Sequence, residues 1–102
     1  MTPPDHRCLS KTLKVIGSKW TIPILHELCD GTRRFGELAR ALPGVSPKTL
    51  TLRLRELEHS GVIQKKVFAQ VPLRVEYSLT LKGKSLRAII TKMRQWGEQS
   101  HG

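Results

Sequence analysis

The sequence predicts a mainly α-helical fold with one small β-hairpin (α+β). Residues 46–63 have the pattern of a capped amphipathic helix, a shorter helical segment precedes them across a turn at Pro43-Gly44, and two strand-like runs follow. A short glycine-containing turn between two helices is typical of a helix-turn-helix, and a hairpin directly after the second helix is a wing. We therefore expect a winged helix-turn-helix.

The 102 residues allow one domain, because a chain of this length has no room for a second core. We expect this domain, residues 1–102, to contain five consecutive parts. They are an N-terminal arm (1–8), two helices (9–31), the helix-turn-helix (35–61), the wing hairpin (62–79) and a C-terminal helix (80–98).

The first helix is expected over residues 9–16 and ends at Gly17. Ser18 then caps a second helix, which closes at residues 29–31 and whose core-facing side chains are Trp20, Ile24, Leu25 and Leu28. Pro23 lies inside this second helix and has no backbone N–H, so either it bends the first turn or the helix begins later. Residues 32–34 are expected to add a short third strand to the wing.

The helix over residues 46–63 has clear signals at both ends. Ser46 can cap its N-terminus, Pro47 suits the first helical position, and Gly61 suits a left-handed residue just after the end. Its apolar stripe consists of Leu50, Leu54 and Leu57. The opposite face carries Lys48, Thr51, Leu52, Arg55 and His59, with Ser46 and Thr49 near the helix start. This face could enter a DNA groove or could be a solvated surface, and its context favours DNA.

That context lies on both sides of the helix. Upstream, residues 35–42 form a short helix with Phe35, Leu38 and Leu42 on one side. Downstream, residues 62–71 and 74–79 are strand-like, with residues 71–73 as their connection.

Thr80 can cap a last helix whose apolar stripe is Leu86, Ile89, Ile90, Met93 and Trp96. This stripe either folds back on its own domain or is covered by a second subunit, and we expect the second because the core already has enough apolar side chains. The expected homodimer seam consists of Leu9, Leu13, Ile16, Ile90, Met93 and Trp96.

The formal net charge of +10 and the pI near 10.3 favour a polyanionic partner, because each neutralised phosphate releases counterions. Membrane surfaces would also attract such a chain. However, no apolar run approaches the roughly 18 residues of a spanning helix, and residues 1–7 lack the features of a signal peptide. We expect a cytoplasmic protein without a membrane partner.

Other classes of function find no support in the motifs. Cys8 and Cys29 are too far apart for a CxxC pair, and His6, His26, His59 and His101 lack metal-ligand spacing. The sequence has neither a phosphate-binding glycine loop nor a G-x-S-x-G motif. We expect no enzyme activity, no metal and no cofactor.

Several separated motifs resemble one family. They are KW at 19–20, RFGEL at 34–38, LPGVSPKTLTLRLRELEHSGVI at 42–63, VP at 71–72 and RVEYSLTLKGKSL at 74–86. In this order they resemble the HxlR-type regulators, which are MarR-like winged-helix transcription factors. The resemblance covers residues 8–96 and implies dimers built from the first and last helices.

The expected DNA surface divides by task. Thr49, Thr51, Leu52 and Arg55 should approach base edges, whereas Ser46 and Lys48 at the positive helix end should hold phosphate. On the wing, Arg74 should reach the minor groove or its phosphates, with Lys65 and Lys66 as further backbone contacts. The resemblance implies a polar residue, often Gln, where Leu52 stands, so Leu52 should contact a thymine methyl instead. Two half-sites of a double-stranded operator should lie about 34 to 36 Å apart.

Cys8 is a possible sensor of oxidants or electrophiles. It precedes the first predicted helix beside His6, Arg7 and Lys11, where positive charge and the helix dipole favour a thiolate. The resemblance adds that some family members use an N-terminal cysteine in this way. The alternative is an inert thiol near the dimer seam, and Cys29 is expected to be structural.

Three functions remain open. The first is a dimeric, sequence-specific transcriptional regulator, whose effector is unknown. The second is a nucleic-acid-binding architectural or RNA-binding protein with little base specificity, and the third is a winged-helix protein interaction module. Weak sequence selectivity would favour the second, and failure to bind any duplex would favour the third.

Overall fold

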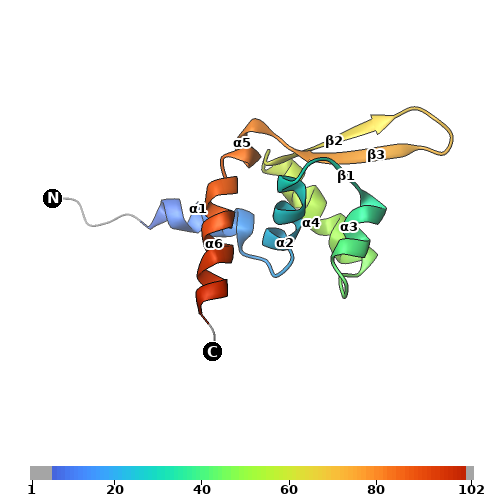
Figure 1. Cartoon of the computed structure of the whole chain (residues 1–102). Coiled ribbons are helices and arrows are strands. Elements are labelled where there is room, and N and C mark those ends of the chain that lie inside the picture. Colours follow the sequence, from blue (N-terminus) through green and yellow to red (C-terminus); the bar gives the residue numbers. More distant parts are fainter. Residues whose placement is uncertain (1–5, 101–102) are drawn as a thin grey trace.

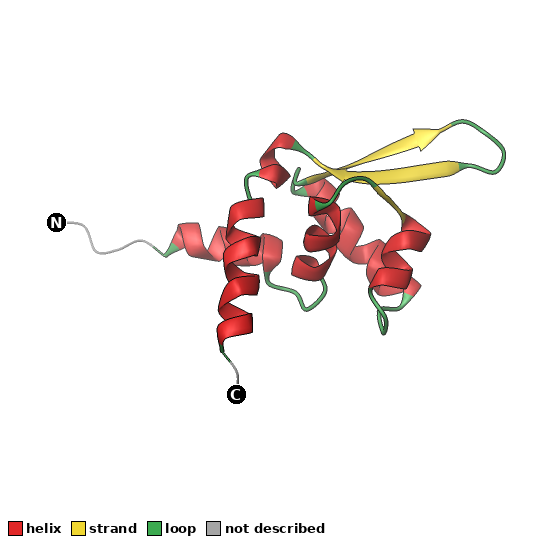
Figure 2. Cartoon of the chain, viewed as in Figure 1, coloured by secondary structure: helices red, strands yellow, loops and turns green. Residues whose placement is uncertain are grey.

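The computed structural model describes residues 6–100, and Figures 1 and 2 show their arrangement. In chain order the elements are α1 (Arg7–Ile16), α2 (Thr21–Cys29), β1 (Arg33–Arg34), α3 (Phe35–Ala41), α4 (Pro47–His59), β2 (Ile63–Phe68), β3 (Arg74–Leu79), α5 (Leu81–Lys84) and α6 (Arg87–Gln99). Helices α2, α3 and α4 gather below the base of an antiparallel sheet, and the β2–β3 hairpin extends beyond them as a wing (Figure 1). The predicted mainly α, winged helix-turn-helix fold is confirmed.

The core lies where α2, α3 and α4 meet the base of the wing. The predicted stripe of α4 is confirmed, since Leu50, Leu54 and Leu57 are each at most 1% exposed. The other buried apolar side chains are Ile24, Leu25, Leu28, Leu38, Leu42, Val62, Ile63, Leu79 and Ile90. Each fully buried leucine stabilises the fold by about 1.5 to 3 kcal/mol, so the stripe holds α4 firmly and leaves its other face free.

Both predicted ends of α4 are confirmed by hydrogen bonds. Ser46 Oγ accepts the backbone N–H of Thr49 at 3.0 Å. At the other end Gly61 has a φ of +78°, its N–H donates to the Glu58 carbonyl at 3.0 Å, and the Val62 N–H donates to the Leu57 carbonyl at 3.1 Å. The Ser46 bond satisfies a backbone N–H at the start of α4, and the Gly61 and Val62 bonds satisfy carbonyls at its end, so α4 stops where the wing must begin.

Helix α2 begins later than residue 18, as the alternative reading of Pro23 allowed. The helix starts at Thr21 without a side-chain cap, so the prediction that Ser18 is its N-cap is wrong. Ser18 Oγ instead hydrogen-bonds to Thr21 Oγ1. The late start places Pro23 in the first turn, where a backbone N–H has no intrahelical partner, and the missing donor therefore costs nothing.

The sheet has the order β1-β3-β2, which confirms the short third strand. The first wing strand is shorter than predicted, because β2 ends at Phe68 rather than at residue 71. The chain turns directly after it, where the Gln70 N–H donates to the Phe68 carbonyl at 2.9 Å. A loop over residues 69–73 therefore forms the tip of the wing.

The prediction of one C-terminal helix over residues 80–98 is wrong, because this segment forms α5 and α6. Thr80 caps α5, accepting the Gly83 N–H at 3.0 Å. The Ser85 and Leu86 N–H groups then donate to carbonyls three residues back, which tightens the chain and redirects it. Gly83, just before this bend, packs so closely on the base of the wing that a side chain would not fit, since a Cβ there would lie 1.9 Å from the Val62 carbonyl oxygen.

Candidate DNA-binding surface

The outer face of α4 presents the side chains predicted to read bases. Thr51, Leu52 and Arg55 are exposed, and Thr49 is half-buried. The first three line a shallow hollow with Pro47 and Lys48. Leu52 is 48% exposed although it is a large apolar side chain in mid-helix, so this face combines cations, hydroxyls and an apolar surface that is open to a partner.

The cap of α4 already uses the hydroxyl of Ser46. Ser46 Oγ accepts the Thr49 N–H and donates its own proton to Thr49 Oγ1 at 2.9 Å. A hydroxyl carries one proton, so the proton of Thr49 is the one that this pair leaves for another acceptor. Of the two residues, Thr49 is the better placed donor to DNA, and the phosphate contact of Ser46 stays a prediction.

On its wing side, α4 lies close to Tyr77 of β3. Burial raises the pKa of Tyr77, the Glu58 carboxylate raises it further, and the Arg55 guanidinium lowers it in part. The phenol is therefore protonated at neutral pH. Arg55 is therefore close enough to the sheet to influence Tyr77, while its side chain stays exposed on the outer face of α4.

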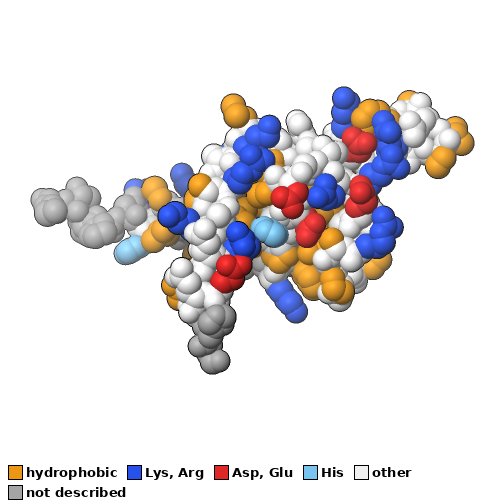
Figure 3. Space-filling model, viewed as in Figure 1, with side chains coloured by type: hydrophobic (Ala, Val, Ile, Leu, Met, Phe, Trp, Pro, Cys, Tyr) orange, Lys and Arg blue, Asp and Glu red, His pale blue; other side chains and the backbone are white. Residues whose placement is uncertain are grey.

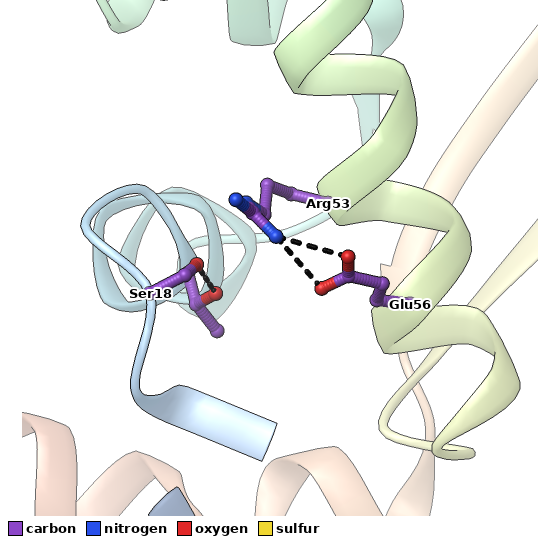
Figure 4. Close-up of polar contacts among 4 residues, drawn as sticks. Ser18, Arg53 and Glu56 are labelled. Carbon is purple, nitrogen blue, oxygen red and sulfur yellow. Dashed lines mark hydrogen bonds and ion pairs between the residues drawn. The ribbon is translucent and has the colours of Figure 1, made fainter. Parts of the chain in front are cut away.

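On the opposite flank, Arg53 forms an ion pair with Glu56 that the sequence analysis missed. Arg53 Nη1 lies 2.9 and 3.0 Å from the two carboxylate oxygens of Glu56. Figure 4 shows the Arg53 side chain extending from α4 toward the turn that carries Ser18. The spacing of three residues between opposite charges was the available sequence signal. Glu56 thus neutralises one cation at the edge of the recognition face.

The two wing lysines lie on opposite faces of the hairpin. In the β2–β3 register Lys65 is paired with Tyr77, and Lys66 is paired with Glu76. Because successive strand residues alternate, Lys65 shares the face that covers the core, whereas Lys66 lies on the other face. The Lys66 ammonium lies 5.2 Å from the centre of the Phe68 ring. A duplex that contacts one face of the hairpin would therefore reach only one of these two lysines.

Arg74 occupies the first position of β3, just behind the tip of the wing. Its guanidinium lies 3.9 Å from the centre of the Phe68 ring. Its Nε lies 3.4 Å from Glu76 Oε2, an ion pair without a hydrogen bond. The side chain is only 29% exposed, so it folds back along the strand instead of extending from the tip. Its expected contact with DNA stays a prediction.

The terminal helices leave large apolar side chains uncovered. Leu9 and Leu13 of α1 are 63% and 62% exposed, and Met93 and Trp96 of α6 are 45% and 72% exposed. Ile16 is half-buried. Ile90 is buried in the chain's own core at 3% exposure, so its predicted place in a dimer seam is wrong: it offers no surface to a partner.

The two cysteines have different surroundings. Cys8 is the second residue of α1 and is exposed, and its carbonyl accepts a hydrogen bond from Thr12 Oγ1 at 3.1 Å. Cys29 ends α2, is half-buried and packs against the core. Its carbonyl accepts a hydrogen bond from Arg87 at 3.2 Å, which ties α2 to α6. Cys8 is thus the more accessible thiol.

The part of the chain that the structure describes offers no cluster of three or more His, Cys, Asp or Glu side chains that could hold a metal ion. Within residues 6–100, each helix is also too short or too polar to cross a membrane. His101, one of the four histidines considered above, lies outside the described residues.

Comparisons with known proteins agree with this geometry. Residues 15–102 match the HxlR-like helix-turn-helix family. The HTH-type transcriptional regulator YdeP of Bacillus subtilis (strain 168) is 48% identical over 88 residues, which are 86% of this chain and 69% of YdeP.

Solved structures extend the comparison to the fold. The redox regulator HypR in its oxidized form has a TM-score of 0.89 and 42% identity, covering 93% of this chain and 98% of that one. A MarR-family regulator from Porphyromonas gingivalis W83 has a TM-score of 0.91 and 36% identity, covering 99% of this chain and 100% of that one. The chain therefore belongs to the HxlR-like helix-turn-helix family and is a DNA-binding transcriptional regulator, not an enzyme.

Proposed function

We propose that the chain acts as a homodimer that reads a specific double-stranded operator with the outer face of α4. The observation that carries this proposal is the exposed set of Thr51, Leu52 and Arg55 on a helix whose other side is fully buried. An architectural protein needs only cations for phosphates. A half-exposed Leu52 adds nothing to phosphate binding, but it can contact the methyl group of thymine in the major groove, and the Thr51 hydroxyl beside it can donate to base edges.

In this proposal the contacts divide by chemistry. Thr49, Thr51 and Arg55 donate hydrogen bonds to bases, and Leu52 packs against a thymine methyl. Ser46 and Lys48 lie at the N-terminal end of α4, where the helix dipole favours phosphate. On the wing, Lys65 contacts the backbone on the side of α4, whereas Lys66 and Arg74 contact it from the other face of the hairpin.

Dimerisation follows from the uncovered side chains of the terminal helices. Leu9, Leu13, Met93 and Trp96 are between 45% and 72% exposed. A patch of this kind at both ends of a helix-turn-helix regulator is best explained by a second copy of the chain. The half-sites should then lie about 34 to 36 Å apart.

The test compares Arg55→Ala with Lys48→Ala on operator variants at several salt concentrations. Loss of a base contact should cost roughly 1 to 3 kcal/mol and relax preference at one position. Loss of a phosphate contact should weaken all sequences alike and lower the salt slope by about one. Lys84→Ala, an exposed cation on α5, is the matched control. If both test variants weaken every sequence equally, α4 does not read bases and the architectural function takes its place.

A second proposal concerns the signal: the exposed Cys8 responds to oxidants or electrophiles. It rests on the exposure of this thiol at the start of α1 and on the likeness to HypR, whose structure is that of a redox regulator. Modification at this helix would act next to the proposed dimer seam and could thereby change the spacing of the recognition helices.

The test measures DNA affinity before and after treatment with diamide or a quinone. Wild type and Cys29→Ser should respond, whereas Cys8→Ser should not. If Cys8→Ser responds as wild type does, the thiol is inert and the sensor lies elsewhere.

A further inference from the structure

The tip of the wing is apolar, although the chain as a whole is strongly basic. The loop over residues 69–73 has the sequence AQVPL and carries no charge. Val71 is 100% exposed and Leu73 is 66% exposed. Figure 3 shows hydrophobic side chains, in orange, at the far end of the wing, beyond its Lys and Arg side chains. Exposing an apolar group at the outermost point of a hairpin to water is unfavourable, so this loop is a candidate surface for contact with a partner.

The cations of the wing lie behind the tip and are held in place. Arg74 stacks on Phe68 at 3.9 Å and pairs with Glu76, and Lys66 lies over the same ring at 5.2 Å. The register places all four of these side chains on one face of the hairpin. Arg74 therefore lies beside the end of the wing, and the tip reaches farther than any of its charges.

The minor groove of DNA fits this arrangement. The groove is about 6 Å wide, so a loop tip can enter it while a two-stranded ribbon with its side chains cannot. Apolar side chains such as Leu and Pro do enter the minor groove in other DNA-binding proteins, where they insert between base steps. The positive charge of the strands directly behind the tip favours DNA over an apolar protein partner.

We propose that Val71 and Leu73 at the wing tip contact the floor of the minor groove and favour A·T pairs there, while Arg74 stays on Phe68 and contacts a phosphate at the groove edge. The inference rests on the proposed operator binding and names the part of the specificity that the wing supplies. The physical reason is the guanine 2-amino group. It projects from the floor at G·C pairs, and an apolar tip would cover this donor without giving it an acceptor.

The probe is a duplex that the protein selects from a random pool, with single base pairs then replaced along its length. Inosine for guanine removes the 2-amino group, and 2,6-diaminopurine for adenine adds it, while both leave the major groove hydrogen-bonding pattern intact. At the pairs below the wing, the wild type should bind the forms without the amino group more tightly, on the order of tenfold. Pairs below α4 should show no such difference.

Two variants then separate the tip from Arg74. Val71→Ser combined with Leu73→Ser should abolish the discrimination and leave the salt slope unchanged. Arg74→Gln should keep the discrimination and lower the salt slope by about one. Leu81→Ser is the matched control, because Leu81 is 86% exposed and lies on α5, away from the tip. All these side chains are largely exposed or at the edge of the wing, so each variant should fold.

Two results would overturn the proposal. One is equal binding of duplexes with and without the amino group at every pair. The other is discrimination that survives in the tip variant but disappears in Arg74→Gln, which would assign minor-groove reading to the arginine. A tip variant that changes only self-association in sedimentation would identify a protein contact instead. Failure to select any duplex from the pool would count against the proposed function and not against the tip alone.

Discussion

The centre of the molecule buries its apolar side chains, whereas its two terminal helices leave most of theirs exposed. In α2, α3, α4 and the base of the wing, the leucine stripe and its neighbours are almost completely buried. In α1, by contrast, none of the residues Arg7–Ile16 is buried, and α6 buries only Ile90. The centre can therefore form its core from one chain, whereas the ends have a surface that one chain does not cover.

Because of this difference, the contact of α4 with DNA and the proposed dimerisation depend on different parts of the chain. A buried stripe fixes the direction of α4 relative to the wing within each chain, so the geometry toward one half-site is local. In the proposed dimer, the distance between two half-sites depends instead on how the terminal helices meet a second copy. Changes at the ends should alter spacing and affinity, and changes in the centre should alter folding itself.

The largest expected effect is on assembly, through Trp96→Ala. The proposed dimer covers Trp96, and removing a covered tryptophan costs about 3 to 5 kcal/mol, so the variant should shift from dimer to monomer while each chain stays folded. Sedimentation equilibrium and circular dichroism measure the two properties separately. Gln95→Ala, the exposed neighbour on the same helix, should leave the dimer intact. A wild-type chain that stays monomeric at high concentration would exclude dimerisation through α1 and α6.

In the centre, Leu54→Ala should reduce the free energy of unfolding by about 2 to 5 kcal/mol, because it leaves a cavity in a core that is 1% exposed at this point. Denaturant unfolding at fixed protein concentration gives the value. Leu81→Ala, at an 86% exposed position, should change it little. Similar losses at both positions would mean that burial does not distinguish the centre from the surface.

A smaller effect is expected at the start of α4. Ser46→Ala removes the side-chain acceptor for the Thr49 N–H and should cost about 0.5 to 2 kcal/mol of stability. Thr51→Ala, at an exposed position within the same helix, is the control and should be neutral or slightly stabilising. Thermal unfolding compares them. Equal stability of the wild type and Ser46→Ala would show that the cap is not needed to form α4.

The smallest effect concerns the ion pair on the flank of α4. Glu56→Gln should change stability by about 1 kcal/mol or less, because the Glu56 side chain is half exposed and such pairs contribute little. The same variant removes a negative charge near the phosphates, so DNA binding should become tighter for all sequences alike. Arg94→Gln breaks an exposed pair with Glu98 on α6 and should lack the DNA effect. Binding that tightens for one sequence only would assign Glu56 to base reading.

Local patterns predicted the helix-turn-helix and its exposed face well. The ends of α4 depend on Ser46, Pro47 and Gly61, whose conformational preferences act over a few residues, and the period of its leucines selects the buried side. The same holds for Thr80, which caps a helix as expected. A helix that is marked by its own residues can be placed without knowledge of the rest of the chain.

Positions that depend on distant contacts were not predictable in this way. The break between α5 and α6 comes directly after a turn of helix that packs closely on a distant segment: Gly83 of α5 lies against the carbonyl of Val62, about twenty residues earlier in the chain. The fold-back of Arg74 requires Phe68 and Glu76 on one face of a paired hairpin, which only the register provides.

Sequence by itself thus determined the order of elements, the buried stripe of α4 and the chemistry of its outer face, because these follow from capping and periodicity within short segments. Tertiary structure alone decided that Ile90 belongs to the core and that Arg74 folds back onto Phe68 and Glu76, away from the tip of the wing. These features depend on which segments pack together, and packing energy is shared among residues that lie far apart in the chain.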